Sequence, residues 1–384
     1  MKKIIIYFYD FFINRLCCLF PIKNNKIIVD NFGGKGYGDN PKYIVEELLK
    51  RSSAFDVVWQ VREHDNSMPS AIRQVIKDTF KARYELLTSK VRIDNIKNGF
   101  EPFKRKGQFY IQTWHGAYGF KPIEQEIQSQ LPKAYIKKGM KDSRITDVFV
   151  SANSNFTEVI KIAFWYSPTT EILESGAPRN DIYFKLDSDE KKTLKKQYGR
   201  DVKILVYAPT FRDSKKGDAY NLDVERIRTT LIEKTGNDWI VVVRLHPNAV
   251  MYADNFHYNN HVINGSFIND LQTLLCISDA LITDYSSIIE DFIIMHKPIF
   301  LYVPDLDEYL LTNRNLRPLF FKQPFKLCKS NDELVNEIVN YNESKYSTNL
   351  KDFLASFYVS FDDGHASERV VDKVLSLINA HSYE

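Results

Sequence analysis

The stretch that most constrains the fold is LITDYSSIIEDFIIMHKPIFLYVPD, residues 281–305. Apolar and β-branched residues up to Thr283 predict a buried strand, and apolar residues at helical spacing over Ile288–Ile294 predict a helix. A Lys-Pro pair closes that helix, and the apolar run Ile299–Val303 predicts a second strand. Strand, helix and strand in this order form one unit of a parallel sheet. We therefore expect a parallel α/β domain.

Polar residues stand where the first of these strands meets the helix. Asp284, Ser286 and Ser287 occupy the turn, and the carboxyl ends of parallel strands are where ligands bind in such sheets. A helix N-terminus presents unpaired N–H groups and a partial positive charge, which suits a phosphate held by the two serines. The equal alternative is that Asp284 or Ser286 only caps the helix.

Two other expected strands end in residues of the same kind. The strand 203–207 is followed by Thr210 and Arg212, and the strand that ends at Arg244 is followed by His246. Because parallel strands end at one edge of a sheet, these side chains and the serine turn should share that edge. Guanidinium groups and hydroxyls together predict a phosphate or diphosphate site.

The first half of the chain repeats the pattern with a histidine. The expected strand Phe109–Thr113 runs into Trp114, His115 and Gly116. Glycine allows a substrate to approach closely, and an imidazole titrates near neutral pH. His115 is therefore a candidate catalytic group, although a lone histidine more often has only a packing or surface role.

A glycine-rich loop lies nearer the N-terminus. It runs from Gly33 to Gly38 between the expected strand Lys26–Asp30 and the expected helix Lys42–Lys50. The glycine spacing matches neither the dinucleotide fingerprint nor the P-loop, so an anion cradle and a plain tight turn are equal alternatives. Further along, a basic stretch over residues 71–88 is expected to be helical.

Chain length indicates two domains, because 384 residues exceed what one hydrophobic core usually serves. The polar segment 186–199 is expected to be a surface helix that bridges them. We place a membrane-associated segment at 1–22, a Rossmann-like acceptor-binding domain at 23–186 and a Rossmann-like donor-binding domain at 187–384. The terminal helices of the last domain are left free to pack on the first.

Charge and cysteine content exclude several classes of protein. With 52 basic and 49 acidic residues the net charge is +3, which gives no support for a nucleic-acid partner. The four cysteines have neither zinc-ligand nor disulfide-framework spacing, and we assign no DxD sequence of the chain to metal binding. We therefore expect no metal and no cofactor, and a reducing compartment.

The first 22 residues resemble a targeting segment, because two lysines precede an apolar run. Asp10, Asn14 and Arg15 interrupt that run, so a secretory signal and a spanning helix both fit poorly. A helix lying in the membrane interface fits better. The alternative is an N-terminal helix packed on its own domain.

Several segments in chain order together carry a resemblance to one family. They are GGKGYGDNPKY (33–43), QTWHG (112–116), SGAPRND (175–181), YAPTFRD (207–213), RLHP (244–247), LITDYSSIIEDF (281–292), KPIFLYVPDLDEY (297–309) and DGHASERV (363–370). In these segments the chain resembles the CDP-glycerol glycerophosphotransferases of teichoic-acid and capsule synthesis. The residues after WHG and His365 depart from the usual pattern, which leaves the acceptor's identity open.

The resemblance implies a GT-B-like fold of two facing Rossmann-type domains with a cleft between them. It implies a peripheral enzyme at the cytoplasmic face of the cell membrane, in which an acceptor hydroxyl attacks the glycerol-bearing phosphorus of CDP-glycerol and CMP is released. The acceptor would be an undecaprenyl-diphosphate-linked saccharide or a glycerol-phosphate chain. Chain length favours a single, primase-like addition, and self-association is left open. The alternatives are ribitol-phosphate transfer from CDP-ribitol and a nucleotide-sugar GT-B glycosyltransferase.

The resemblance also assigns residues to roles. One imidazole would take the acceptor's proton and the other would steady the leaving phosphate; these catalytic residues are His115 and His246. Residues expected to bind CDP-glycerol are Thr210, Arg212, Arg244, Asp284, Ser286, Ser287 and Asp305. Residues expected to bind the acceptor are Gly34, Lys35, Asp39, Asn40, Trp114 and Lys121.

Overall fold

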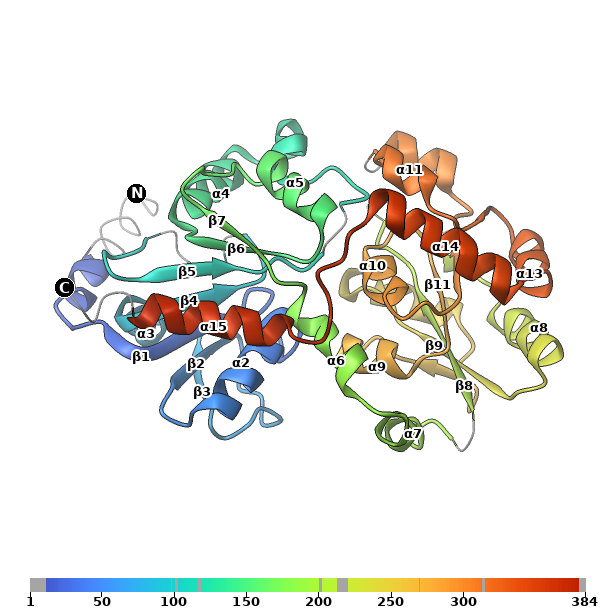
Figure 1. The fold of residues 1–384 in the computed structure, drawn as a ribbon, viewed down its shortest axis with the longest axis horizontal. Helices are drawn as coiled ribbons and strands as arrows, with labels where there is room; N and C mark the ends of the chain where they lie inside the picture. Colours follow the sequence, from blue (N-terminus) through green and yellow to red (C-terminus); the bar gives the residue numbers. More distant parts are fainter. Residues whose placement is uncertain are drawn as a thin grey trace. The chain divides into compact units, whose positions relative to one another are not determined.

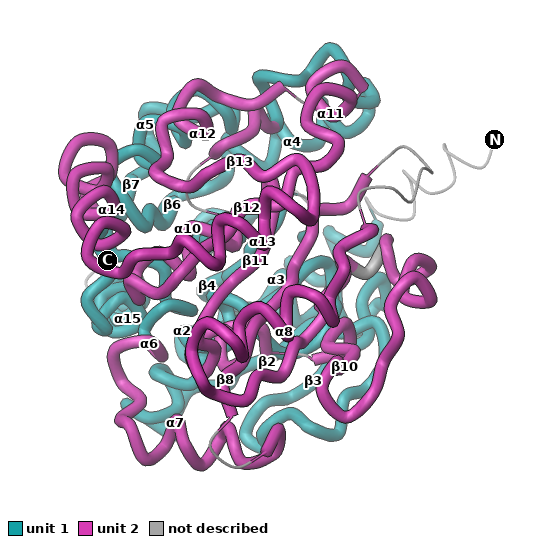
Figure 2. The backbone as a smooth tube through the Cα atoms, turned by 90° about the vertical axis from the view of Figure 1, so that its right-hand side faces the viewer, with its two compact units in different colours: residues 1–115, 124–181, 360–384 teal, residues 116–123, 182–359 magenta. Residues whose placement is uncertain are grey.

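A computed structural model describes residues 12–97, 99–100, 103–116, 119–199, 202–212, 220–268, 270–312 and 315–379. The chain divides into two compact units (Figure 2). Unit 1 contains residues 1–115, 124–181 and 360–384, and unit 2 contains residues 116–123 and 182–359. Each unit is therefore assembled from segments that are far apart in the sequence.

The described part of unit 1 contains a seven-stranded sheet in the order β3-β2-β1-β4-β5-β6-β7 (Figure 1). All of its strand pairs are parallel. The strands are β1 (Lys23–Asp30), β2 (Asp56–Val61), β3 (Arg73–Ile76), β4 (Ser89–Asp94), β5 (Phe109–Gln112), β6 (Val148–Ser151) and β7 (Glu171–Glu174). The last residues of the two central strands, Asp30 and Asp94, pair in register. The chain segments that follow these two strands therefore start side by side.

Helices cover both faces of this sheet. They are α2 (Asp39–Arg51), α3 (Phe80–Thr88), α4 (Lys133–Ile145), α5 (Ser154–Ala163) and α15 (Ala366–Asn379), with 3₁₀ segments η1 (Glu124–Gln130) and η2 (Pro178–Asp181). Side chains alternate along β1, so Ile27 and Val29 pack with α2 and α15 while Ile28 faces α3. Asn153 caps α5, because its side chain accepts a hydrogen bond from Phe156 N.

The helix expected over residues 71–88 is wrong in its first half. The structure has the strand β3 there, and the helix α3 begins only at Phe80. Val75 and Ile76 are β-branched and pair with β2, which outweighs helix propensity in this segment. Thr79 then caps α3 by accepting a hydrogen bond from Ala82 N.

The C-terminal helix α15 belongs to unit 1. Val370, Val371 and Val374 are fully buried in its core, and the Asp181 carboxylate caps the helix by accepting from Ala366 N at 2.9 Å and Ser367 N at 2.8 Å. The SGAPRND and DGHASERV segments therefore contact each other. The second segment therefore has a structural role at the start of α15.

The described part of unit 2 contains a six-stranded sheet in the order β10-β9-β8-β11-β12-β13, again with all pairs parallel. The strands are β8 (Lys203–Ala208), β9 (Trp239–Val243), β10 (Val262–Asn264), β11 (Ala280–Thr283), β12 (Ile299–Tyr302) and β13 (Leu327–Cys328). The strand–helix–strand unit predicted over residues 281–305 is confirmed as β11, α10 (Ile288–Ile293) and β12.

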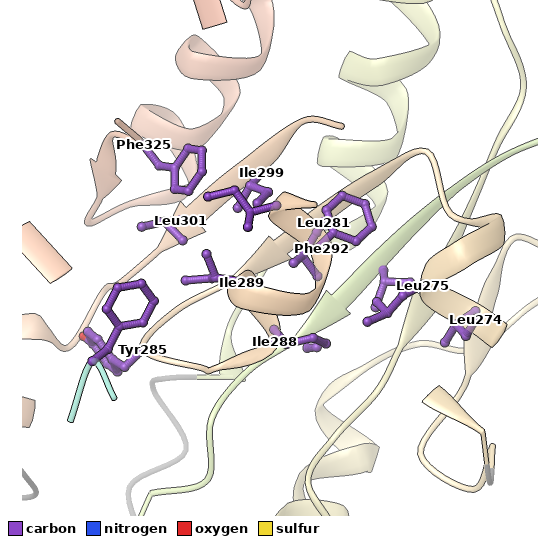
Figure 3. Packing of buried hydrophobic residues seen from close by; sticks show 14 of the residues in the cluster. Leu274, Leu275, Leu281, Tyr285, Ile288, Ile289, Phe292, Ile299, Leu301 and Phe325 are labelled. Atoms are coloured by element: carbon purple, nitrogen blue, oxygen red, sulfur yellow. The ribbon is translucent and has the colours of Figure 1, made fainter. Parts of the chain in front are cut away.

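Helices also cover both faces of the unit 2 sheet. Besides α10 they are α6 (Ile182–Lys185), α7 (Ser188–Lys195), α8 (Val224–Thr235), α9 (Leu271–Ile277), α11 (Leu306–Thr312), α12 (Pro318–Lys322), α13 (Asn331–Val339) and α14 (Glu343–Phe357), with the 3₁₀ segment η4 (Pro247–Asn255). On one face Tyr285, Ile289 and Phe292 pack against Leu281 and Leu301 of the sheet (Figure 3). The predicted surface helix is confirmed as α7, which has a capping box and buries none of its residues.

No helix in the described ranges is both long and apolar enough to cross a membrane.

Candidate functional site

A tight turn at the carboxyl end of β5 places the histidine of unit 1. Trp114 has a left-handed φ of 52°, and its N–H donates to Gln112 Oε1 at 2.9 Å. The Trp114 ring packs against Phe164 and lies 4.3 Å from the His115 ring, centroid to centroid. The Phe32 ring contacts His115 at 5.2 Å in an edge-on arrangement. The imidazole therefore lies in an aromatic setting that restricts its orientation.

The protonation state of His115 follows from one hydrogen bond. Its Nδ1 lies 2.7 Å from the backbone carbonyl oxygen of Asn95. Because a carbonyl only accepts, Nδ1 must carry a proton, which leaves the lone pair of the neutral ring on Nε2. Burial lowers the His115 pKa from its ordinary value, and the hydrogen bond to Asn95 opposes that shift only in part. The ring is therefore neutral at pH 7 and can accept a proton at Nε2.

Two of the predicted acceptor residues support this turn. Asn40 Nδ2 donates to Trp114 O at 3.0 Å, and Asn40 Oδ1 accepts from Arg179 N at 3.1 Å. The Arg179 guanidinium also pairs with Asp39 at 3.4 Å. The structure thus brings Asp39, Asn40, Trp114 and His115 together through the turn at residues 179–181.

The N–H groups of the glycine-rich loop form hydrogen bonds within the protein. Gly33 N and Gly34 N donate to the Asp30 carboxylate at 2.7 and 3.2 Å, so these N–H groups already have an anionic partner. Gly34 has φ 87°, and a Cβ there would lie 3.1 Å from the backbone nitrogen of Arg62. These contacts support the plain-turn alternative at Gly33 and Gly34. Lys35 is exposed at the outer side of the loop.

In unit 2 a buried guanidinium organises the carboxyl edge of the sheet. Arg212 Nε donates to Asp305 Oδ2 at 2.6 Å, and its Nη2 donates to Asp284 Oδ2 at 2.8 Å. Its Nη1 donates to Thr210 O at 2.6 Å. The Tyr285 and Tyr309 rings lie 4.9 and 5.0 Å from the guanidinium carbon. Arg212 is only 2% exposed, and three of its neighbours already use its nitrogens. This setting differs from the direct diphosphate contact that we expected.

Asp284 is part of the same network and is not a helix cap. Its carboxylate accepts from Thr210 N at 3.0 Å and from the Thr210 hydroxyl at 2.5 Å, so it faces β8 and away from α10. Ser286 Oγ does accept from Ile288 N, at 3.3 Å. The capping alternative is therefore wrong for Asp284 and right in part for Ser286. Ser287, the residue before α10, is exposed.

The third strand end carries Arg244 and His246. Arg244 Nη1 donates to the carbonyls of Gly265 and Ile268 at 3.0 and 2.6 Å, and burial lowers the Arg244 pKa. His246 is exposed, and its ring lies 5.8 Å from that of Phe211. Because β8, β9 and β11 are adjacent parallel strands, the prediction that these three strand ends share one edge is confirmed.

Lys121 lies in unit 2, although we expected it in the first domain. Its Nζ is 5.8 Å from the centre of the Tyr309 ring. That ring stacks on Tyr285 at 3.9 Å, so Lys121 borders the Arg212 network. Gly116 also belongs to this unit, and a Cβ there would lie 3.4 Å from Ser287 Oγ. Residues 117 and 118, which follow the WHG motif, lie outside the described residues.

Sequence reasoning missed Asn31 and Asn95. Each follows a central strand of unit 1 directly, and Asn95 Nδ2 donates to Asn31 Oδ1 at 2.8 Å. A signal was present, because the continuous apolar run of KIIVDN and the alternating run of KVRIDN both end with Asp-Asn. The sequence pattern does not predict β4 as a strand, so the residues at its carboxyl end are not among the predicted site residues.

These arrangements define what each edge can do chemically. Unit 1 offers a neutral imidazole that can take a proton from a hydroxyl. Unit 2 offers hydroxyls, an exposed imidazole and fixed charges of both signs, which suit a phosphorylated ligand. Within the described part of the chain, no group of three His, Cys, Asp or Glu residues could hold a metal ion.

Comparison with known sequences shows the same family that the motifs indicated. A family model described as CDP-Glycerol:Poly(glycerophosphate) glycerophosphotransferase matches residues 12–376. The teichoic acid poly(glycerol phosphate) polymerase of Bacillus spizizenii is 28% identical over 94% of this chain and 94% of its own length. The teichoic acid glycerol-phosphate transferase of Staphylococcus aureus is 29% identical over 94% and 95%. The chain spans 51% of the Staphylococcus epidermidis polymerase, at 29% identity.

Solved structures give the same result for the fold. The wall teichoic acid polymerase TagF, in a histidine-to-alanine variant, matches with a TM-score of 0.83 and 25% identity over 99% of this chain and 96% of that chain. A histidine-to-asparagine variant soaked with CDPG matches with a TM-score of 0.82 and 27% identity over 94% and 90%. The expected GT-B-like fold is thereby confirmed.

Proposed function

The chain belongs to the CDP-glycerol:poly(glycerophosphate) glycerophosphotransferase family, and we propose that it transfers glycerol phosphate from CDP-glycerol to a hydroxyl of a lipid-linked acceptor in teichoic acid synthesis. The observation that carries this proposal is the state of His115. Its Nδ1 is hydrogen-bonded to a carbonyl and its pKa is lowered, so Nε2 is ready to accept a proton. Activation of a hydroxyl nucleophile needs such a base.

The proposed step is a substitution at phosphorus. The acceptor oxygen forms a bond to the glycerol-bearing phosphorus of CDP-glycerol, and the bond from that phosphorus to the bridging oxygen breaks. CMP leaves with the bridging oxygen, and the acceptor's proton passes to His115 Nε2. His246 would steady the charge that develops on the departing phosphate.

We place the donor at the unit 2 sheet edge. The hydroxyls of Thr210, Ser286 and Ser287 and the cationic side chain of Arg244 would contact the diphosphate or its neighbours. Asp284 and Asp305 already accept hydrogen bonds from Arg212. They would bind nucleotide or glycerol hydroxyls only through the remaining acceptor positions of their carboxylates. The contacts of Arg212 support a shaping role, in which it fixes these carboxylates and Thr210.

We place the acceptor at the sheet edge of unit 1, and Lys121 of unit 2 stays a predicted acceptor residue. The exposed ammonium of Lys35 would pair with a phosphate of an undecaprenyl-diphosphate-linked saccharide. Asp39, Asn40 and the close turn at Gly34 would act mainly by holding the loops, as their internal hydrogen bonds indicate. Trp114 offers an aromatic side chain beside the imidazole.

A donor assay tests the proposed function. Purified protein is incubated with CDP-glycerol, CDP-ribitol or a UDP-sugar in the presence of a lipid-linked disaccharide, and nucleotide release and product mass are measured. We expect CMP release and a product heavier by glycerol phosphate with CDP-glycerol. CMP release with CDP-ribitol alone would establish the ribitol alternative, and UDP release would establish a glycosyltransferase.

The same mass spectrum counts the units added. We expected a single addition from chain length, but length gives that expectation no support. The Bacillus spizizenii polymerase is covered over 94% of its length, and the Staphylococcus aureus transferase over 95%. Identities of 28% and 29% to proteins with these two names do not separate the two modes.

We propose that the N-terminal segment attaches the protein to the cytoplasmic face of the membrane. Residues 1–11 lie outside the described part. Beyond them Phe12 is 68% and Leu19 is 80% exposed, while Ile13 and Cys17 pack on Leu87. The segment is therefore held by its own unit and still presents apolar side chains, as an interfacial helix does.

Vesicle binding tests this attachment. Replacing Phe12, Leu16 and Leu19 by serine removes exposed apolar groups and leaves the packed residues in place, and we expect binding to phosphatidylglycerol vesicles to fall at least about tenfold. The matched control is Met251→Ser with Phe267→Ser, which removes groups of 74% and 73% exposure from unit 2. Equal binding by both variants and the wild type would contradict the proposal.

A further inference from the structure

We propose that Asn95 is a positioning residue, which fixes the ring orientation and the proton-bearing nitrogen of His115. The inference rests on the proposed role of His115 as the base, and it adds a residue that no motif of the sequence marked. Asn95 is fully buried and follows β4 directly. It contacts the histidine through its backbone, and through its side chain it holds the chain segment that packs on the histidine.

The backbone contact sets the tautomer. Asn95 O accepts from His115 Nδ1 at 2.7 Å, and in an imidazole the hydrogen bond at one nitrogen determines which nitrogen is free. A movement of this carbonyl would release Nδ1 and allow the proton to reside on Nε2. The ring would then present a donor where the proposed reaction needs an acceptor.

The side chain fixes that carbonyl in place. Asn95 Nδ2 donates to Asn31 Oδ1 at 2.8 Å, and Asn95 Oδ1 accepts from Phe32 N at 2.8 Å. Because Asp30 and Asp94 pair in register, Asn31 and Asn95 begin adjacent segments at the same sheet edge. Both functional groups of the Asn95 amide are thus used between two loops.

Phe32 gives the second restraint on the imidazole. Its backbone has a φ of 47°, an uncommon conformation for a residue with a large side chain, and one that surrounding contacts must maintain. The bond from its N–H to Asn95 is one of these contacts, and its ring lies 5.2 Å from that of His115. Asn95 therefore restrains His115 from two directions.

The same network reaches the glycine-rich loop. Asn31 Nδ2 donates to Lys35 O at 2.8 Å, so the proposed acceptor lysine and the proposed base are linked through two asparagines. A displacement of the loop would therefore change the position of the imidazole through these hydrogen bonds. Asn95 thus couples the place where the acceptor is held to the group that deprotonates it.

Nuclear magnetic resonance of ¹⁵N-histidine-labelled protein tests the proposal directly. The His115 signals are identified by their loss in His115→Gln, and their shifts report which nitrogen carries the proton. We expect the Nδ1–H form in the wild type at pH 7.5. In Asn95→Ala we expect mixed tautomers and kcat lower by at least about tenfold, with the CDP-glycerol KM within about twofold.

Two further variants separate positioning from general stability. Asn153→Ala removes another buried asparagine of unit 1, the cap of α5, and should lower thermal stability while leaving the His115 tautomer and kcat unchanged. Asn31→Ala removes the acceptor for Asn95 Nδ2 but keeps the bond from Phe32 N to Asn95 Oδ1, so its kcat should lie between those of Asn95→Ala and the wild type.

The tautomer measurement remains decisive if the activity assay fails. An Nε2–H form in the wild type, or an unchanged Nδ1–H form with unchanged kcat in Asn95→Ala, would overturn the positioning role. Absence of CMP release from the wild type would overturn the proposed function, while the tautomer would still decide whether Asn95 sets the state of the ring.

Discussion

The two sheet edges have the same topology and are organised by different side chains. In unit 1 the amides of Asn31 and Asn95 follow the carboxylates that end β1 and β4, and Asn95 orients a neutral imidazole. In unit 2 the strand ends carry a guanidinium and two carboxylates, which pair with one another below the surface around Arg212. A parallel sheet therefore fixes where functional groups gather, while the residues near each strand end decide which interactions organise the edge.

This difference has an energetic consequence. A neutral hydrogen-bonded network that loses one member leaves buried polar groups unsatisfied, at a cost of about 1–3 kcal/mol. A buried ion pair that loses one partner leaves an uncompensated charge, which costs far more than the pair contributes when intact. Loss of Arg212 should therefore act mainly on stability, and loss of Asn95 mainly on activity.

The largest expected effect is on the stability of unit 2. Arg212→Met leaves Asp284 and Asp305 without their buried counter-ion, and we expect the free energy of unfolding of this unit to fall by about 3–5 kcal/mol. Hydrogen exchange of the β8 and β11 amides measures the loss locally. Arg212→Lys should recover only part of it, because one ammonium cannot reproduce a planar fork.

A second arginine of unit 2 provides the matched control. Arg226 pairs with Asp332, and the two side chains are 47% and 75% exposed. Arg226→Met should cost no more than about 1 kcal/mol, since solvent screens exposed pairs. Equal losses in the two variants would show that the Arg212 network is not the charged centre of this edge.

The next effect is on catalysis. His115→Ala and His246→Ala should each lower kcat by at least about a hundredfold, because each removes a proposed catalytic imidazole, while CDP-glycerol still binds. Single-turnover kinetics with labelled CDP-glycerol measure both quantities. A near-normal rate in one variant would remove that histidine from the mechanism and confine the chemistry to the other edge.

The smallest effect is on pH dependence, and it distinguishes the two histidines. Burial lowers the His115 pKa, so the proton that blocks Nε2 binds only below the ordinary value of 6.5. Activity should therefore fall as pH decreases through a value under 6.5. The depressed pKa also means that the contribution of His115 to stability is present above pH 6.5 and is lost as pH falls through the lower folded value.

The acid limb of kcat/KM for CMP release provides the measurement. It should persist in His246→Ala, because the base remains in place, and change in His115→Ala. If the acid limb is lost in His246→Ala and persists in His115→Ala, the proposed roles of the two histidines are reversed.

Much of this architecture could be predicted where the local pattern and the tertiary contacts agree. The β11–α10–β12 unit follows from its apolar spacing, and the shared edge of β8, β9 and β11 follows from parallel topology. The strands β3 and β4 could not be predicted in this way. β3 has only four residues, and β4 buries Lys90 and Arg92 at positions where a buried strand usually has apolar side chains.

The site could be predicted as a set of residues more readily than as a set of contacts. Arg212 and Asp284 both lie at the expected edge, but sequence cannot show that they satisfy each other. Asn95 acts through its carbonyl, a group that every residue has, so its importance depends on the neighbours that tertiary structure supplies.

The return of α15 to unit 1 has a consequence for synthesis on the ribosome. All of residues 182–359 are translated before Val370, Val371 and Val374 exist to fill the core of unit 1. Unit 2 can thus complete its core before α15, the last helix of unit 1, has been translated. During that interval the nascent chain exposes an incomplete apolar surface, which is the condition under which chaperones are recruited and aggregation begins.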